Sequence, residues 1–218
     1  MARPAAILCV VGLAREAAIA GPPFAIGAHS IPRDLSGFDA VMSFGLCGAL
    51  DPDLRPGDLI VGDEVTSEGR RLACDGPWTD ALFAALPRAR RGLIAGSTGI
   101  VATPDQKASL RAGTGAIAVD MESAAAGRAA AEAGIPLVIL RAVSDAADCS
   151  LPRSAQAGFS ATGEPDVGAV IAALIRRPWE LPRLLRAAVE AEAGFRGLLQ
   201  ARAALDRSFP NASQGPDG

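Results

Sequence analysis

The sequence predicts an α/β fold in which a mixed central sheet is flanked by helices on both faces and followed by a helical extension. Aliphatic runs of strand length alternate with Ala-rich runs of helical periodicity as far as residue 150, and glycines stand at most of the boundaries. Beyond residue 150 the pattern is helical, and no strand follows it. We therefore expect a single domain over residues 1–218, with a catalytic core at 1–150 and a helical segment at 165–208.

The length and composition fit one large globular unit without a basic surface. A chain of 218 residues buries roughly 70% of its unfolded surface on folding, which is enough for a sizeable core. Half of the residues are hydrophobic, mostly Ala, Leu, Ile and Val, and there is no Tyr. The net charge is -3 and few aromatic side chains are present to stack on bases, so nucleic-acid binding is not expected.

Four cysteines and one histidine give no sign of a metal site or a disulfide framework. The cysteines are spread along the chain without a C-x-x-C pair. We expect no metal, no cofactor and a reducing, cytoplasmic location. The amino-terminal apolar run covers residues 5–11, which is too short to cross a bilayer and lacks a signal-peptide pattern.

The first 101 residues are expected to contain four strand regions and two helices. Each strand region is aliphatic, and each helix has apolar residues at helical spacing. The first helix ends at Gly21, and Pro52, Pro56 and Gly57 mark a loop before the third strand region, which has a hairpin-like sequel. The expected elements are a strand at 6–11, a helix at 13–21, strands at 38–50 and 58–69, a helix at 79–89 and a strand at 91–101.

The rest of the core continues the alternation. TPDQKASLRAGTG has a Thr cap at its start and a glycine at its end, and SAAAGRAAAEAG is a small-residue helix that ends on Gly134. Strands are expected at 116–122 and 135–145. The later helical segment is expected to break at Pro178 and Pro182, and the polar, Gly/Pro-rich residues 209–218 are expected to be disordered.

Acidic residues at the ends of the last two predicted strands are candidate ligand-binding groups. The carboxyl ends of parallel strands line the ligand crevice of such sheets. One strand ends with Asp120 and Glu122, which share a face if the backbone stays extended, and the next ends with Ser144 and Asp145. Glu122 can instead cap the following helix, and Asp145 can instead pair with Arg141.

Three sequence motifs resemble those of the nucleoside phosphorylase and nucleosidase superfamily. The stretch AVDMESAAAGRAAAEAGIPLVILRAVSDAAD is similar to the family's V-[DE]-M-E segment, small-residue helix and strand ending in R-A-[VI]-S-D. SFGLCGALDPDLRPGDLIVGDEV resembles its glycine-rich turn and the next strand, and VVGLAREA resembles its first strand and turn. These motifs stand in the family's order between residue 6 and about residue 150. The resemblance implies a nucleoside phosphorylase-like fold and an enzyme that cleaves the N-glycosidic bond of a purine nucleoside.

The resemblance also implies roles for the acids. Glu122 is expected to bind the ribose hydroxyls, and Asp145 is expected to protonate or hydrogen-bond N7 of the purine, so both are candidate catalytic residues. An aspartate at this position favours a 6-amino purine, so adenine is the expected leaving base. The other residues expected to bind the substrate are Asp120, Met121, Ser144, Gly45, Gly99, Ile100 and Val101.

The nucleophile stays open between phosphate and water. Phosphorylases of the superfamily bind phosphate, here a potential co-substrate, on the backbone of two glycine-rich turns, whereas the hydrolytic members position water with a glutamate after the first turn. Leu46 and Ser43 replace a hydroxyl and a basic residue of the phosphate site, and Glu16 lies one residue short of the usual glutamate position. The residues expected at this phosphate or water site are Gly12, Arg15, Glu16 and Gly48.

The carboxyl-terminal helical segment carries an apolar stripe beside several arginines. The stripe consists of Trp179, Leu181, Leu184, Leu185 and Val189. With the LPRSAQAG loop, this segment resembles the bacterial hopanoid-associated phosphorylases, which implies the lipid-linked nucleoside adenosylhopane as the substrate. The stripe can shield the lipid or make a peripheral contact with the inner membrane, and an ordinary dimer or core-covering helix is the alternative.

Two other functions remain open at this stage. One is a methylthioadenosine or S-adenosylhomocysteine nucleosidase, which shares the adenine and ribose contacts. The other is a non-catalytic adenosine-binding protein of the same fold. The resemblance further implies a homo-oligomer.

Overall fold

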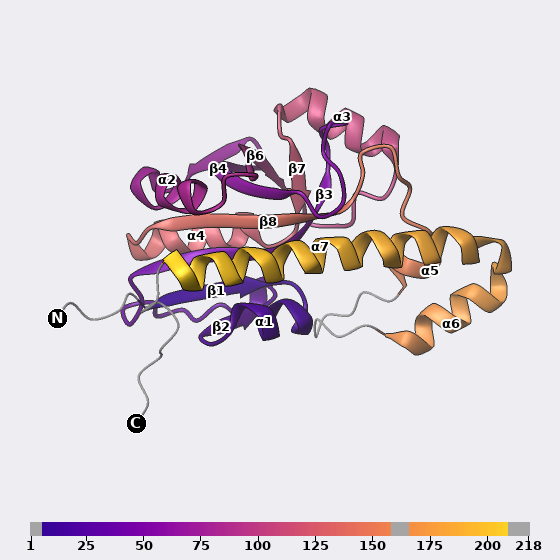
Figure 1. Cartoon of the computed structure of the whole chain (residues 1–218), viewed down its shortest axis with the longest axis horizontal. Helices are drawn as coiled ribbons and strands as arrows, with labels where there is room; N and C mark the ends of the chain where they lie inside the picture. Colours follow the sequence, from indigo (N-terminus) through magenta and orange to yellow (C-terminus); the bar gives the residue numbers. More distant parts are fainter. Residues whose placement is uncertain (1–5, 158–165, 209–218) are drawn as a thin grey trace.

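The computed structural model describes residues 6–157 and 166–208, which form a mixed eight-stranded sheet with helices packed on it (Figure 1). The strands are β1 (Ile7–Val11), β2 (Phe24–Ile26), β3 (Ala40–Ala49), β4 (Leu59–Ser67), β5 (Arg70–Ala73), β6 (Arg90–Gly96), β7 (Ala118–Asp120) and β8 (Leu137–Asp145). The helices are α1 (Ala14–Ala20), η1 (Ala28–Ser30), α2 (Gly76–Ala85), α3 (Pro104–Thr114), α4 (Ser123–Ala133), α5 (Arg153–Gln156), α6 (Val167–Arg176), η2 (Pro178–Glu180) and α7 (Leu181–Ser208).

Strand β8 lies between two long strands of the sheet. The hydrogen-bonded order is β2-β1-β3-β7-β6-β4-β5, and β8 pairs in parallel with β3 and antiparallel with β4. Its first seven residues are all buried, which is why the sequence LVILRAV is a continuous run rather than an alternating one. A single charged side chain, Arg141, interrupts this run.

Small side chains let helices pack closely on both faces of the sheet. One hydrophobic cluster contains Ala124, Ala126 and Ala130 of α4, whereas a separate cluster contains residues of α1, α2 and α7. Helix α7 lies along β8 (Figure 1), and its Gly197 approaches the backbone so closely that an added Cβ would lie 2.7 Å from the carbonyl oxygen of Gly57. The predicted α/β architecture with helices on both faces is confirmed.

The start of α4 differs from the prediction in a way that matters for the site. A strand was expected over 116–122, but β7 ends at Asp120, and Glu122 has helical dihedral angles (φ -107°, ψ -31°). The backbone turns here because the Asp120 carboxylate accepts a hydrogen bond from the amide of Ser123, at 3.0 Å, and so caps the first turn of α4. The expectation that Asp120 and Glu122 share one strand face is therefore wrong.

Three smaller differences concern the ends of elements. The strand expected at 91–101 stops at Gly96, and the short elements β2 and η1 were not expected. Pro182 does not break the last helix, because α7 begins at Leu181 and a proline is tolerated in the first turn. The prediction for residues 209–218 lies outside the described residues.

Helix α3 is fixed at both ends by its own sequence. Thr103 accepts from the amide of Gln106, whose side chain accepts from the amide of Thr103 in return, and Gly115 ends the helix in a left-handed conformation with φ 76°. These caps set the position of Lys107, the fourth residue of the helix.

Substitution of Gly96 by Ala tests the close approach of α4 to the sheet. An added Cβ would lie 2.5 Å from Cβ of Ala124, so we expect Gly96→Ala to lower the free energy of unfolding by about 1–3 kcal/mol. The matched control is Gly113→Ala in α3, where nothing lies within 4 Å of the added atom and a stabilisation of up to about 1 kcal/mol is expected. Urea unfolding measures both, and equal stability of the two variants would contradict the packing described.

Candidate active site

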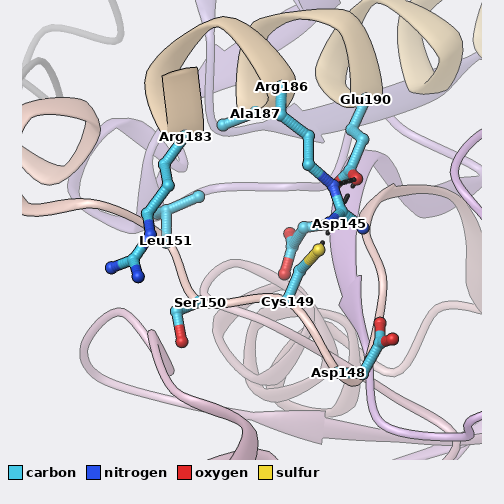
Figure 2. A pocket seen from close by; sticks show the side chains of 9 residues that line it. All are labelled: Asp145, Asp148, Cys149, Ser150, Leu151, Arg183, Arg186, Ala187 and Glu190. Atoms are coloured by element: carbon cyan, nitrogen blue, oxygen red, sulfur yellow. Dashed lines mark hydrogen bonds and ion pairs between the residues drawn. The ribbon is translucent and has the colours of Figure 1, made fainter. Parts of the chain in front are cut away.

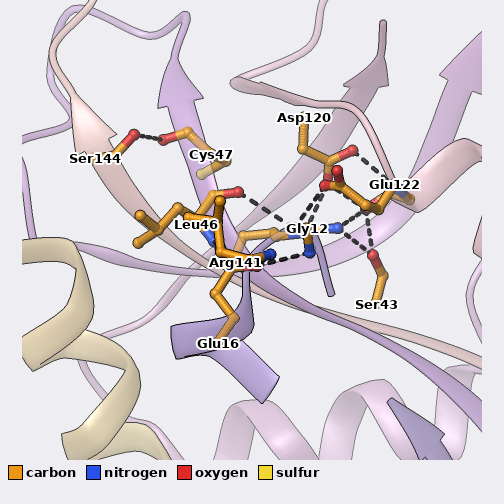
Figure 3. A network of polar contacts seen from close by, with 11 residues as sticks. Gly12, Glu16, Ser43, Leu46, Cys47, Asp120, Glu122, Arg141 and Ser144 are labelled. Carbon is orange, nitrogen blue, oxygen red and sulfur yellow. Dashed lines mark hydrogen bonds and ion pairs between the residues drawn. The ribbon is translucent and has the colours of Figure 1, made fainter. Parts of the chain in front are cut away.

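Two clusters of charged and hydroxyl side chains are built on β3, β7 and β8 and on the helices α3 and α4. The arginine cluster consists of Arg141, Asp120, Glu122, Ser43 and Ser123, and the acid Glu16 lies beside it (Figure 3). The lysine cluster consists of Lys107, Asp145 and Ser144. Each cluster combines residues that are far apart in the sequence.

The arginine cluster is built around a fully buried guanidinium. Nε of Arg141 lies 2.7 Å from Oδ2 of Asp120, and its Nη1 lies 3.4 Å from Oε2 of Glu122. The first contact is an ion pair without hydrogen-bond geometry, since Nε has no hydrogen-bond acceptor among the residues described. A buried cation is costly unless it is paired, so these two carboxylates are what allow Arg141 to stand in a core strand.

Two serines complete the arginine cluster. The Ser123 hydroxyl donates to Oδ2 of Asp120, and Nη2 of Arg141 donates to the Ser43 hydroxyl. The two hydroxyl oxygens lie 2.9 Å apart. These hydrogen bonds, together with the two ion pairs of Arg141, link β3, β7, α4 and β8.

Glu16 fills a pocket of backbone amides. Its carboxylate accepts hydrogen bonds from the amides of Gly12 at 2.7 Å, Leu13 at 2.9 Å and Leu46 at 2.7 Å, and the residue is only 2% exposed. Burial raises the pKa of Glu16 to about 7, although Arg141 and the amide donors act in the opposite direction. The arrangement requires glycine at position 45, where φ is +154° and an added Cβ would lie 2.7 Å from the carboxylate.

Glu122 lies next to Glu16. An added Cβ on Gly12 would stand 2.8 Å from Oε1 of Glu122, and Gly12 also donates to Glu16, so both acids border the same glycine. The Glu122 side chain is 17% exposed, unlike that of Asp120, which is enclosed. Burial raises the pKa of Glu122, and the nearby Arg141 opposes this effect. Glu122 is therefore the acid of the arginine cluster that a ligand can reach.

The lysine cluster holds Asp145. Nζ of Lys107 lies 2.5 Å from Oδ2 of Asp145, and the Ser144 hydroxyl donates to Oδ1 at 2.7 Å. Asp145 is in register with Gly48 of β3, three residues beyond Gly45, which separates the two clusters by roughly 10 Å along the strand.

A cavity of about 260 Å³ opens beside Asp145 (Figure 2). It lies between the turn that follows β8 and the amino-terminal half of α7, and Arg183 and Arg186 of that helix border it. Asp145 has a side-chain exposure of 17%. A ligand in this cavity can therefore contact the Asp145 carboxylate directly.

The expected residues are not all brought together. Arg15 turns towards α7, where it pairs with Glu192 at 2.6 Å and stacks on the ring of Phe195 at 4.1 Å, so it does not join the amides around Glu16. Met121 is 44% exposed. The remaining expected residues near the base, Gly99, Ile100 and Val101, lie in the loop before α3, which is tied to the turn after β8 by the hydrogen bond from the amide of Leu151 to the carbonyl of Ala102.

Three ion pairs were not expected from the sequence: Arg141 with Asp120, Arg141 with Glu122, and Lys107 with Asp145. The alternative pairing of Asp145 with Arg141 is wrong, because Arg141 binds Asp120 and Glu122 while Asp145 binds Lys107. The position of Arg141 inside an aliphatic strand could have indicated that it has a buried acidic partner. Lys107, the one lysine in the sequence, stood on a predicted helix and gave no such signal.

The chain matches a known family along most of its length. The sequence model described as "Phosphorylase superfamily" matches residues 4–176. Among solved structures, a 5'-methylthioadenosine/S-adenosylhomocysteine nucleosidase from Neisseria meningitidis has a TM-score of 0.66 and 18% identity, covering 95% of this chain and 99% of the other. The Helicobacter pylori enzyme of the same name has a TM-score of 0.64 and 15% identity over 95% and 99% of the chains. The similarity in fold therefore extends over nearly the whole chain.

Replacement of Arg141 by Met tests the dependence of the site on the buried guanidinium. The change leaves Asp120 and Glu122 without their cation, and we expect a loss of about 3–5 kcal/mol in the free energy of unfolding. Arg91→Met is the matched control, because Arg91 pairs with Asp63 and Asp80 at the surface, and it should leave stability nearly unchanged. Denaturant unfolding of both variants measures this, and a mild loss in Arg141→Met would show that the cluster is not structurally essential.

Proposed function

From the premise that the chain belongs to the phosphorylase superfamily, whose members cleave N-glycosidic bonds, we propose that it hydrolyses an adenine nucleoside with a bulky 5' substituent. Cleavage of this bond builds positive charge on the ribose and negative charge on the departing base. The site therefore needs anionic groups at the sugar and a proton donor at the purine. Glu122 and Glu16 supply the first requirement in this proposal, and Asp145 supplies the second.

The position of Glu16 is the observation that carries the proposal. The amides of Gly12, Leu13 and Leu46 are the groups on which a phosphate would bind, and all three donate to the Glu16 carboxylate. A phosphate at this place would meet a negative charge instead of free donors. Water is therefore the nucleophile we propose, with Glu16 as the general base, since its pKa of about 7 lies near the pH at which it must accept a proton.

Asp145 and its surroundings support a purine as the leaving group. The carboxyl is reachable from the neighbouring cavity. Its register partner Gly48 lies three residues, roughly 10 Å along β3, beyond Gly45, which borders Glu16, and a nucleoside can span an offset of this size. The Neisseria meningitidis structure is a complex with methylthio-immucillin-A. A solved S-adenosylhomocysteine nucleosidase from Streptococcus pyogenes, with a TM-score of 0.59 and 18% identity over 90% of this chain and 97% of the other, is a complex with 5-methylthiotubericidin. Both ligands were bound by proteins of the same fold, which favours a 5'-substituted nucleoside here.

The 5' substituent that we favour is the hopane skeleton of adenosylhopane. Helices α6, η2 and α7 expose large apolar side chains towards solvent, among them Ile175, Trp179 and Val189, with exposures of 76%, 70% and 67%. Arg176 and Arg177 lie in the same segment. The apolar side chains of this surface can therefore contact an apolar lipid while the arginines contact anionic groups around it. Within residues 6–157 and 166–208, none of the helices has the length and hydropathy that crossing a bilayer requires. Methylthioadenosine or S-adenosylhomocysteine is the second candidate, favoured by the solved relatives.

Glu16→Gln tests the nucleophile. Adenine release by the native protein should proceed in phosphate-free buffer and yield free ribose products, and kcat/KM should fall about tenfold per pH unit below a pH of about 7, because protonated Glu16 cannot accept a proton from water. Glu16→Gln should reduce the rate on the order of 100- to 10,000-fold and remove this pH limb.

Glu64→Gln is the control for that experiment, since Glu64 pairs with Arg71 at the far edge of the sheet and its loss should leave the rate unchanged. A strict requirement for phosphate, with ribose 1-phosphate products, would refute hydrolysis. Failure to release adenine from any adenine nucleoside would favour the non-catalytic binding function.

A comparison of substrates tests the 5' group. Values of kcat/KM for adenosylhopane, methylthioadenosine and S-adenosylhomocysteine are measured with the same enzyme preparation, adenosylhopane in detergent. We expect adenosylhopane to be preferred by on the order of tenfold or more, because burial of further apolar surface favours its binding. A preference for methylthioadenosine would instead assign the chain to the second candidate function.

A further inference from the structure

We infer that Lys107 is a positioning residue of the proposed site, which fixes the hydrogen-bonding polarity of the Asp145 carboxyl and thereby selects 6-amino over 6-oxo purines. The inference rests on the proposed function, because it concerns the acid that meets the purine. It adds to that function a residue that touches neither ribose nor base.

Lys107 is buried and all of its donors are used. The residue is 1% exposed, and its ammonium donates to Oδ2 of Asp145 at 2.5 Å, to the carbonyl of Ala146 at 2.6 Å and to the carbonyl of Cys149 at 3.2 Å. An ammonium has three N–H donors and no acceptor, so these contacts exhaust its capacity. Helix α3 thus holds both the candidate acid and the turn behind it.

The direction of this contact determines what each oxygen of Asp145 can do. Because lysine cannot accept a hydrogen bond, Oδ2 must be an acceptor, and a proton carried by the carboxyl is confined to Oδ1. The Ser144 hydroxyl beside Oδ1 fits either state, because it can also donate to the carbonyl of Cys47 at 3.1 Å and accept from a protonated carboxyl. Asp145 therefore presents one oxygen that only accepts and one that can donate.

This polarity matches the edge of adenine. When the bond from C1' to N9 breaks, its electron pair moves to the purine, the Oδ1–H bond breaks and a bond from N7 to that hydrogen forms. The second oxygen accepts from the exocyclic amine. A 6-oxo purine would set the lone pairs of O6 against those of Oδ2, which cannot carry a proton while Lys107 donates to it.

Lys107 acts through Asp145 rather than on the ligand. It is absent from the lining of the cavity in Figure 2, which includes Asp145 and Cys149, two of the three residues that it holds. Its ammonium therefore supports one wall of the cavity from behind.

Lys107→Met removes the ammonium but keeps an unbranched side chain of similar length. In the native protein kcat/KM should favour 5'-methylthioadenosine over 5'-methylthioinosine, and in Lys107→Met this preference should fall by about tenfold or more, because Oδ2 can then carry a proton and donate to O6. The rate on methylthioadenosine should drop by on the order of 100-fold, as loss of a positioning contact can cause. Arg111→Met, which removes a cation of the same helix that pairs with Asp51, should change neither quantity.

A double-mutant cycle separates this role from a general loss of stability. In an Asp145→Asn background, Lys107→Met should have no further effect on the rate, since it acts only through Asp145. The double variant also lacks the unpaired carboxylate, so it remains usable if the single variant folds poorly. An equal rate loss in both backgrounds would overturn the inference.

Equilibrium binding of adenine and hypoxanthine to the same variants gives a readout that needs no turnover. The native preference for adenine should shrink in Lys107→Met and persist in Arg111→Met. If the native protein releases no adenine but shows this pattern, the proposed function fails while the role of Lys107 stands. If it releases adenine and Lys107→Met keeps the full preference for 6-amino purines, only the role of Lys107 is refuted.

Discussion

The buried guanidinium of Arg141 is the interaction on which the rest of the structure depends. It is itself fully buried in a strand that is covered on both faces, and its charge is balanced by the enclosed Asp120 and the partly exposed Glu122. Because an uncompensated charge there costs several kcal/mol, the ends of β7 and β8 and the start of α4 can form only together. The same requirement holds Glu122 beside Glu16, so a single packing constraint also sets the geometry of the candidate site.

The sequence predicted the elements well because most of them carry local signals. Aliphatic strands, capped helices and terminal glycines specify themselves, and the stretch from Ala118 to Asp145 contained three acids of the candidate site, Asp120, Glu122 and Asp145. Ion partners were not predictable in this way, because they depend on which strands are neighbours. Only after β8 is placed between β3 and β4 does Arg141 come near Asp120, and only the packing of α3 brings Lys107 to Asp145.

The glycines of the second turn have a meaning that their sequence alone did not reveal. They resembled a phosphate-binding backbone, yet on β3 Gly45 is in register with Arg141 and Gly48 with Asp145. At both positions an added Cβ would crowd a carboxylate, 2.7 Å from that of Glu16 and 3.2 Å from that of Asp145. Because both residues are glycines, there is room for the carboxylates of Glu16 and Asp145. The backbone amides that resembled a phosphate site bind the carboxylate of Glu16 instead.

Glu16 and Asp145 lie in different electrostatic surroundings, and this difference fits the roles proposed for them. Glu16 accepts hydrogen bonds only from backbone amides. Arg141 also attracts its charge, but this arginine already balances two other carboxylates. The effect of burial therefore prevails, and the pKa of Glu16 rises to about 7. Asp145 instead has an ammonium of its own at 2.5 Å, directed at one oxygen. A base that exchanges its proton near neutral pH is suited to activating water, whereas a carboxyl with a fixed polarity is suited to recognising a purine edge. The fold thus places two carboxyl groups in different electrostatic surroundings, since one has neutral amide donors and the other a dedicated cation.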